Sequence, residues 1–281
     1  MKTYLFIDIE TVPCVSHISN LDPILRQFWN EKYTKFKEET ESENDYFMRS
    51  AWLIPEFGKI ICLSAWYEEK WKFKSTSYLN HNHKWEEKQM LELFLKMYWS
   101  TDRVLVWHNL KYFDLPFINR RCLFHWLNIP KSMEILDKAP RKINHIDTMD
   151  MYKNGWSRCS LWVISYLLTG DHPKTDISGA DVCRVFYEWI EKGTVEETIQ
   201  RISEYCERDV LYTWKIFKIM KNQAKKADPY FIEPQQPLLE WVPKSSENVP
   251  YHDTANKVRQ DMIKREQKKE KSMDDIVNSV I

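Results

Sequence analysis

Two acidic side chains lie two positions apart near the start of the chain, directly after an apolar run. The run Tyr4–Ile7 predicts a buried strand, and Asp8 and Glu10 follow at its end. Because side chains alternate between the faces of a strand, both carboxylates must point to the same side. Two like charges at the edge of an apolar sheet resist burial unless a cation lies between them. These residues therefore indicate a metal site, although two solvated acids at a strand tip explain this stretch equally well.

A third acidic candidate, Asp114, follows a second apolar strand. The run VLVW at 104–107 is apolar throughout, which is typical of a strand buried on both faces. Asp114 then opens a helix that contains Phe117 and Ile118. Residue preference alone favours a helix N-cap at Asp114. Its position after a strand instead favours a role in a binding site, because the ligands of open α/β sheets collect at the strand ends.

The last main candidates lie on a long helix near the end of the apolar pattern. A capping-box pattern begins at Thr194, and helical spacing continues to about Lys221. Tyr205 and Asp209 are four residues apart and share one face of this helix. Asp209 interrupts an apolar stripe, so it needs a metal, an internal Arg or Lys, or a backbone partner; we favour a metal. The rest of the stripe is Ile202, Cys206, Val210, Thr213 and Phe217.

The short basic segment around residues 133–150 offers a secondary candidate. It ends in His145, Asp147 and Asp150. We treat Asp147 as a secondary candidate that reaches a phosphate or the metal cluster. The alternative is a cap or a solvated acid, which is the commoner use of an acid next to a turn.

The remaining pattern predicts the elements that position these side chains. Residues 59–67 and 71–79 alternate as the two antiparallel strands of a hairpin. Residues 84–99, 161–168 and 181–192 show the helical spacing of apolar side chains. Together these elements predict an α/β fold, with a mixed central sheet flanked by α-helices.

Composition excludes several classes of protein. The chain has 281 residues, with 41 Lys and Arg against 41 Asp and Glu, so net charge neither supports nor excludes nucleic acid as a partner. Its six cysteines form no CxxC pair and no zinc-type spacing, which fits reduced thiols and a cytoplasmic location. Its five glycines form neither GxGxxG nor GxxxxGK, which argues against kinases, ATPases and dehydrogenases. No apolar run approaches about 18 residues, so we expect no membrane span.

We expect one main domain over residues 1–222 and an appendage over 223–281. A polar insertion of about residues 14–50 interrupts the main domain, and its part at 31–45 has six acids against three lysines, as in a solvated segment. The appendage has five prolines within 22 residues, which predicts an extended segment or a linker. The basic tail at 257–271 either adds electrostatic affinity for nucleic acid or is a solvated terminus.

Three motifs occur in order along the main domain. They are Asp8-Ile9-Glu10, Asn109 through Phe113-Asp114, and Tyr205 through Asp209. They resemble the motifs D-x-E, N-x-x-x-F-D and Y-x-x-x-D of the DEDD superfamily of 3′–5′ exonucleases, tyrosine subclass. The run HNLKYFDLPF also looks like the second motif of family B DNA polymerase proofreading domains, and the order of elements is similar to that of the stand-alone exonucleases related to them. Each motif alone is weak, whereas three in order on suitable elements are specific.

The resemblance implies a ribonuclease H-like fold and a metal-dependent 3′–5′ exonuclease that hydrolyses phosphodiester bonds. It also implies two Mg²⁺ or Mn²⁺ ions as cofactors, which carboxylate oxygens suit as ligands. In this scheme Asp8 bridges the two ions, and Asp114 binds the second ion mainly through water. Glu10 and Asp209 bind the first ion, and Tyr205 orients the attacking water.

Residues of the second motif are candidates for binding the substrate. Asn109 and Phe113 are expected to shape the pocket for the nucleic-acid end. Trp107 or Tyr112 is a candidate for stacking on a terminal base, although core packing is the commoner use of either.

The expected partner is the 3′ end of a nucleic acid, with single-stranded DNA as the first hypothesis. An RNA-trimming exonuclease is the alternative, because the sequence shows no reader of the 2′-OH. A catalytically silent nucleic-acid-binding module is less favoured, since all four carboxylates and the tyrosine are present. The sequence indicates no membrane and no particular protein partner.

Overall fold

A computed structural model describes the part of the chain that carries all of the candidate site residues. The described residues are 4–69, 72–79, 87–99, 103–135, 137–153, 158–171, 177, 179–192 and 195–224. Thr194 and residues 225–281, with the proline-rich segment and the basic tail, lie outside them. What the sequence predicts for those residues stays a prediction.

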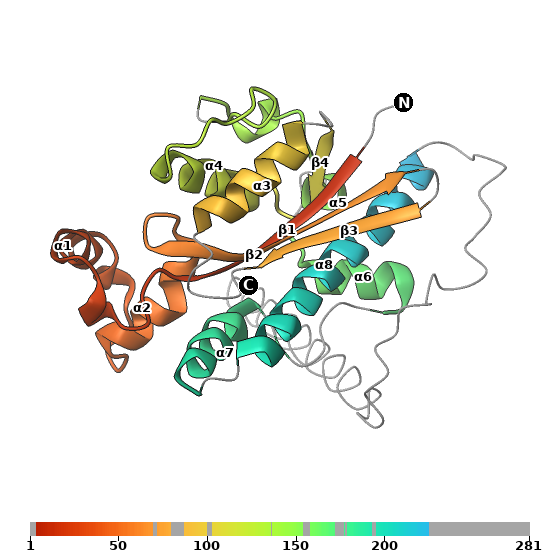
Figure 1. Ribbon diagram of the computed structural model, residues 1–281. Coiled ribbons are helices and arrows are strands. Elements are labelled where there is room, and N and C mark those ends of the chain that lie inside the picture. The colour runs from red at the N-terminus through yellow and green to blue at the C-terminus, as the bar shows by residue number, and fades with distance from the viewer. Residues whose placement is uncertain are drawn as a thin grey trace, which may run out of the picture. The chain divides into compact units, whose positions relative to one another are not determined.

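The centre of the fold is a five-stranded mixed sheet with the order β3-β2-β1-β4-β5 (Figure 1). β1 pairs antiparallel with β2 and β2 with β3, whereas β1 pairs parallel with β4 and β4 with β5. The predicted hairpin and the predicted strand at 104–107 are confirmed. The strands are β1 (Tyr4–Pro13), β2 (Gly58–Glu69), β3 (Lys72–Leu79), β4 (Val104–Trp107) and β5 (Ile146–Asp147).

Strand β1 lies in the middle of the sheet, and each of its residues after Tyr4 is buried. Asp8 lies opposite Ser64 of β2, and Glu10 lies opposite Cys62. The register then shifts, because a bulge follows Glu10. β4 runs parallel beside the first residues of β1, so its C-terminal end lies level with the two acids. The sheet therefore brings two of the predicted strand ends together.

Helices cover both faces of the sheet, with α3 and α4 on one side and α6, α7 and α8 on the other (Figure 1). The long helix α8 packs on β1 and β2 and is contacted by α5, α6 and α7. Its Phe217 ring lies edge-on to the rings of Tyr4 and Phe6, at centroid distances of 5.0 and 5.5 Å. The predicted helices are confirmed where the structure describes them; residues 84–86 of the first lie outside the described residues. Their bounds are α3 (Glu87–Trp99), α4 (Asp114–Phe124), α6 (Leu161–Thr169), α7 (Gly179–Lys192) and α8 (Val195–Ala224). The helix α5 (Thr148–Lys153) and the short 3-10 helix η4 (Pro140–Lys142) were not predicted.

A buried acid, Glu87, ties α3 and α4 to β2. Its carboxylate accepts hydrogen bonds from the backbone N–H of Ile60 at 2.7 Å, from Nε of Arg121 at 2.9 Å and from Nε2 of His125 at 2.8 Å. Burial alone would raise the pKa of Glu87, but the hydrogen bonds from His125 and Arg121 outweigh burial and lower it. Glu87 is therefore an ionised acid that holds the scaffold together.

The insertion at residues 14–50 has an apolar core of its own. Trp29 is fully buried, and its ring centroid lies 4.9 Å from that of Phe47 and 5.1 Å from that of Phe57. The solvated character predicted for residues 31–45 is confirmed, because most of that stretch is exposed. The insertion as a whole, however, is more than a polar surface segment. Its elements are η1 (Ile18–Asn20), α1 (Pro23–Lys32), η2 (Thr34–Phe36) and α2 (Glu43–Ser50), followed by η3 (Ala51–Leu53).

Candidate active site

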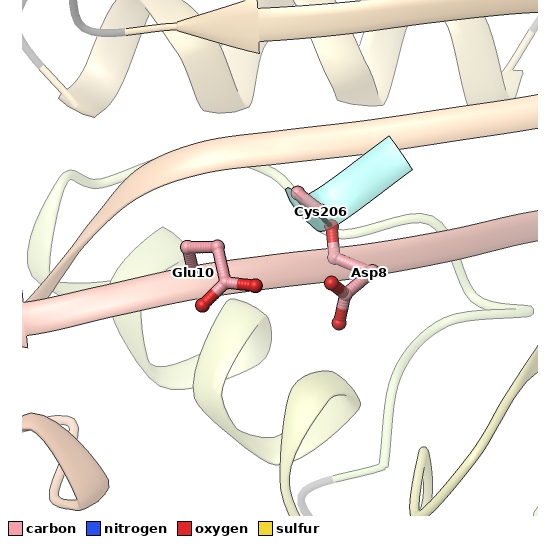
Figure 2. A group of neighbouring side chains, drawn as sticks. All are labelled: Asp8, Glu10 and Cys206. Carbon is pink, nitrogen blue, oxygen red and sulfur yellow. Dashed lines mark hydrogen bonds between the residues drawn. The ribbon is translucent and has the colours of Figure 1, made fainter. Parts of the chain in front are cut away.

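Strand β1 presents two buried carboxylates on the same side, as the alternation of strand side chains predicts (Figure 2). Asp8 is 5% exposed and Glu10 is 7% exposed. Cys206 reaches the same place from α8, and one ligand atom from each of the three residues lies within 4.8 Å of the others. The Cys206 thiol donates to the backbone carbonyl of Asp8 at 3.5 Å. Two oxygen donors and one sulfur donor thus share a small space.

Helix α8 brings Tyr205 and Asp209 to this place. The hydroxyl of Tyr205 and the carboxylate of Asp209 come from residues one helical turn apart, and the charge of Asp209 raises the pKa of the phenol. Tyr205 is buried and Asp209 is partly buried. Asp209 lies close enough to the acids of β1 that its charge raises the pKa of both Asp8 and Glu10. The position of Asp209 in the apolar stripe is explained by this cluster.

Asp114 joins the cluster from a third element. It is the first residue of α4, and Phe113 occupies the N-cap position, so the alternative of an N-cap at Asp114 is wrong. Asp114 is 1% exposed, and neither of its carboxylate oxygens makes a hydrogen bond of normal geometry within the described residues. Oδ2 of Asp8 is in the same situation there. A buried acceptor without a hydrogen-bond partner lowers the stability of the fold, so this arrangement indicates that the carboxylates bind a ligand.

Burial and mutual repulsion raise the pKa of three of these carboxyls well above the usual range. For Asp8, burial is the largest cause, followed by the charges of the other three carboxylates. Burial also leads for Glu10, with the charge of Asp209 next. For Asp114, burial again leads, and nearby backbone N–H groups offset part of the rise in pKa. Neighbouring carboxylate charges thus oppose the ionisation of all three carboxyls, and a divalent cation would reverse this effect.

The phenol of Tyr205 stays protonated at any ordinary pH. Burial raises its pKa, and the charges of Asp209 and Glu10 raise it further. A phenol in this state donates hydrogen bonds, but it is not available as a general base. The arrangement fits a positioning role for this side chain.

The donor set fits hard divalent cations. Carboxylates are the ligands that Mg²⁺ and Mn²⁺ prefer, and Asp8, Glu10, Asp114 and Asp209 supply them. Cys206 is a softer donor, and burial raises the pKa of its thiol, which keeps it protonated. Cys206 was not predicted as a member of the site, because its apolar character fits the helix stripe. The available signal was its place directly after Tyr205, on the side of α8 that meets β1.

Asp147, the secondary candidate, is buried and holds the loop between β4 and α4. Its Oδ1 accepts the backbone N–H of Asn109 at 2.9 Å and that of Met149 at 2.9 Å. Its Oδ2 accepts the backbone N–H of Lys111 at 3.1 Å. Both oxygens are therefore engaged by the backbone, which favours a structural role over the predicted contact with a phosphate or a metal.

The two predicted stacking candidates, Trp107 at the end of β4 and Tyr112 in the loop after it, differ in their exposure. Trp107 is 5% exposed and packs in the core, whereas Tyr112 is 39% exposed. Asn109 has a positive φ of 75°, and its carbonyl accepts the N–H groups of Tyr112 and Phe113, both at 3.1 Å. The Phe113 ring is partly buried, and its centroid lies 6.4 Å from that of Trp52. Of the two predicted stacking candidates, Tyr112 is the one that a ligand can reach.

The strand order β3-β2-β1-β4-β5, with helices on both faces, defines an RNase H-like fold. A family model of the RNase H superfamily matches residues 52–221 of the 281. The chain therefore belongs to the RNase H superfamily. The matched range includes Asp114, Tyr205 and Asp209, while Asp8 and Glu10 precede it.

Among solved structures, the chain is similar to the family B DNA polymerase from the hyperthermophilic archaeon Pyrobaculum calidifontis. The sequence identity is 11% and the TM-score is 0.40. The match covers 74% of this chain and 24% of the polymerase chain, so this chain spans about a quarter of that protein. No curated protein sequence matches the chain significantly. Within the described ranges, no helix has both the length and the apolar character needed to cross a bilayer.

Proposed function

We propose that this protein is a metal-dependent 3′–5′ exonuclease of the tyrosine subclass of the DEDD superfamily, acting on single-stranded DNA. The observation that carries the proposal is that acids from β1, α4 and α8 lie near enough for Glu10, Asp114 and Asp209 to raise the pKa of Asp8, with the Tyr205 phenol within range of three of these charges. Carboxylates that raise one another's pKa in a buried cluster are typical of functional sites, where a bound cation compensates their repulsion. Membership of the RNase H superfamily supports a nucleic acid as the substrate.

The carboxylates would hold two Mg²⁺ or Mn²⁺ ions, which would stabilise the attacking and leaving oxygens of a phosphodiester. Asp8 suits the bridging position, because each of the other three carboxylates contributes to its raised pKa. We assign Glu10 and Asp209 to the first ion and Asp114 to the second.

Three other side chains would prepare the reaction. Tyr205 orients the attacking water through its protonated hydroxyl, which leaves the proton on the phenol throughout. Asn109 and Phe113 shape the pocket for the 3′ nucleotide, in the loop that Asp147 holds. These residues bind and orient, and none of them has to take up a proton.

The test uses 5′-labelled and 3′-labelled oligonucleotides of one sequence, as DNA and as RNA, in single- and double-stranded form. We expect single-stranded DNA with a 5′ label to shorten one nucleotide at a time in Mg²⁺ or Mn²⁺, and to stay intact in EDTA. Degradation from the 5′ end would refute the proposed polarity. Faster loss of RNA than of DNA would make the protein an RNA-trimming exonuclease.

Two variants connect that activity to the site. Asp8→Ala should lower the rate about a thousandfold or more while the circular dichroism spectrum stays unchanged. Glu92→Ala, at an exposed acid of α3, is the matched control and should keep full activity. Wild-type turnover in Asp8→Ala would refute the mechanism. A wild-type protein that binds these oligonucleotides without cleaving them would be the binding module instead.

A further inference from the structure

The loop before α4 places an exposed tyrosine among cationic side chains. Nζ of Lys153 and Cζ of Arg158 each lie 4.9 Å from the ring centroid of Tyr112. Such contacts hold positive charge and an aromatic ring together at the surface. The combination of aromatic rings and cations is typical of surfaces that bind single-stranded nucleic acid.

A cavity of about 320 Å³ lies beside Tyr112. Phe113, Phe117 and Leu53 contribute apolar walls, and Lys111 contributes a charged group. This volume is near the lower end of the range for small-ligand sites, so it suits one nucleotide rather than a duplex. We use the name Tyr112 site for this cavity together with Tyr112 and the four cations Lys111, Arg120, Lys153 and Arg158.

The Tyr112 site contains more cationic side chains than acidic side chains that form ion pairs with them. Asp150 forms ion pairs with Lys111 at 3.5 Å and with Lys153 at 2.7 Å. Glu56 forms an ion pair with Arg120 at 3.5 Å. Among the described residues, these two acids pair with three of the four cations, so the cations outnumber the acids that pair with them by two. A strand with one phosphate per nucleotide complements that excess.

The Tyr112 site is joined directly to the carboxylate cluster by the chain. Tyr112 is exposed and Asp114, two residues later, is buried, so the same short loop serves both places. Asp147 and the carbonyl of Asn109 fix the backbone of this loop through hydrogen bonds. A strand whose end lies at Asp114 therefore has the Tyr112 site within reach of its next nucleotides.

Building on the proposed exonuclease function, we infer that the Tyr112 site binds an unpaired nucleotide of the substrate strand, beside the nucleotide that is removed. The base enters the cavity against Tyr112 and Phe113, and the neighbouring phosphates contact the cations. Aromatic contact of this kind tolerates every base, because every base has a π-face. The site consequently selects an unpaired strand rather than a particular sequence.

Binding is tested by fluorescence anisotropy on the full chain in EDTA, so that metal-dependent cleavage does not interfere. The probes are a labelled short oligothymidylate and a blunt duplex with the same labelled strand. Tyr112→Ala should weaken single-strand affinity about tenfold, and Tyr112→Phe should change it less than about twofold. Tyr166→Ala, at a tyrosine of α6 that is 43% exposed, is the control and should bind as the wild type does. Arg158→Ala should reduce the salt dependence of single-strand binding by a slope of about 0.7.

Kinetics in Mg²⁺ separate this inference from the exonuclease proposal. Tyr112→Ala should raise KM for single strands more than it lowers kcat, whereas Asp8→Ala should abolish turnover. Wild-type affinity and KM in Tyr112→Ala, with cleavage that still depends on Asp8, would refute the inference and leave the exonuclease proposal standing. Loss of single-strand affinity in Tyr112→Ala, in a protein whose wild type cleaves no substrate, would support the binding site and refute the exonuclease.

Discussion

Replacing Asp147 with Asn distinguishes a residue that shapes the site from one that binds metal. In the wild type, Oδ1 accepts the N–H groups of Asn109 and Met149, and Oδ2 accepts that of Lys111. The Asn side chain keeps one oxygen acceptor, but its NH₂ group must face a backbone N–H that now has no acceptor. Asp147→Asn therefore removes a charge-assisted hydrogen bond and sets two donors against each other.

The expected loss of unfolding free energy is about 3 kcal/mol, the sum of a lost hydrogen bond to a charged group and an unsatisfied, partly buried donor. For a domain of this size, each kcal/mol lowers the melting temperature by about 2–4 °C. Asp147→Asn should consequently melt about 6–12 °C below the wild type. The decrease should be the same in EDTA and in Mg²⁺, because the lost bonds involve the backbone only.

Thermal unfolding followed by circular dichroism provides the assay, with Asp114→Asn as the comparison variant. The rise in melting temperature on adding Mg²⁺ or Mn²⁺ should be as large in Asp147→Asn as in the wild type, and smaller in Asp114→Asn. A wild-type melting temperature in EDTA, combined with loss of the metal-induced rise, would refute the reasoning and make Asp147 a metal ligand.

The remaining predictions concern the metal, pH, the phenol and the scaffold. A divalent ion at about 100 times its Kd should add about 2.7 kcal/mol of stability in a thermal-shift assay, and a flat response up to millimolar Mg²⁺ and Mn²⁺ would count against the metal site. In EDTA, Asp8→Asn should gain stability relative to the wild type as pH rises above about 4, because a raised folded-state pKa stabilises the wild type only while the carboxyl keeps its proton. Urea denaturation across pH measures this, and a constant difference between the two proteins would contradict it. Tyr205→Phe should lower kcat about 10- to 100-fold in the cleavage assay and leave the metal-induced rise in melting temperature unchanged; an altered rise would mean that the phenol acts through metal binding. Glu87→Ala leaves the charge of Arg121 without its buried partner and should cost about 3–5 kcal/mol in urea denaturation. A cost below about 1 kcal/mol there would mean that the pair behaves like an exposed one.

The placement of the carboxylates could be predicted because each follows from a regular local pattern. The period of a strand puts Asp8 and Glu10 on one side, and the period of a helix puts Tyr205 and Asp209 on one face. Asp114 follows a buried strand, and parallel pairing of that strand with β1 fixes which end of the sheet it reaches. Those regularities also predict the mixed α/β sheet.

The surroundings of the cluster could not be predicted, because they depend on contacts that have no period. Asp147 accepts hydrogen bonds from a loop, and the backbone path of this loop depends on the positive φ of Asn109. Trp107 and Tyr112 are equally suited to stack on a base by residue type. Their difference in exposure arises because Trp107 ends a buried strand and Tyr112 lies in the loop after it.

The apolar core of the insertion was missed for a similar reason. Its aromatic residues come from α1 and the residue after it, from α2, and from Phe57, which lies just before β2. Trp29 and Phe47 stand far apart in a stretch that is mostly charged, so no helical or strand period connects them. The polar sequence of the insertion correctly predicted its exposed surface, but it gave no sign of the buried aromatic core.

The short helix η3, directly after the insertion, also supplies part of the Tyr112 site. Leu53 lines the cavity, and the Trp52 ring lies against Phe113, while the Trp52 carbonyl is anchored by the hydroxyl of Thr11 at 2.8 Å. The acids that would do the chemistry belong to β1, α4 and α8, whereas this part of the cavity wall belongs to η3. One wall of the proposed strand-binding cavity is thus encoded apart from the acids, while Lys111 and Tyr112 lie in the loop that leads directly to Asp114. Changing Leu53 alone therefore offers a route to an altered strand preference that changes none of the acids.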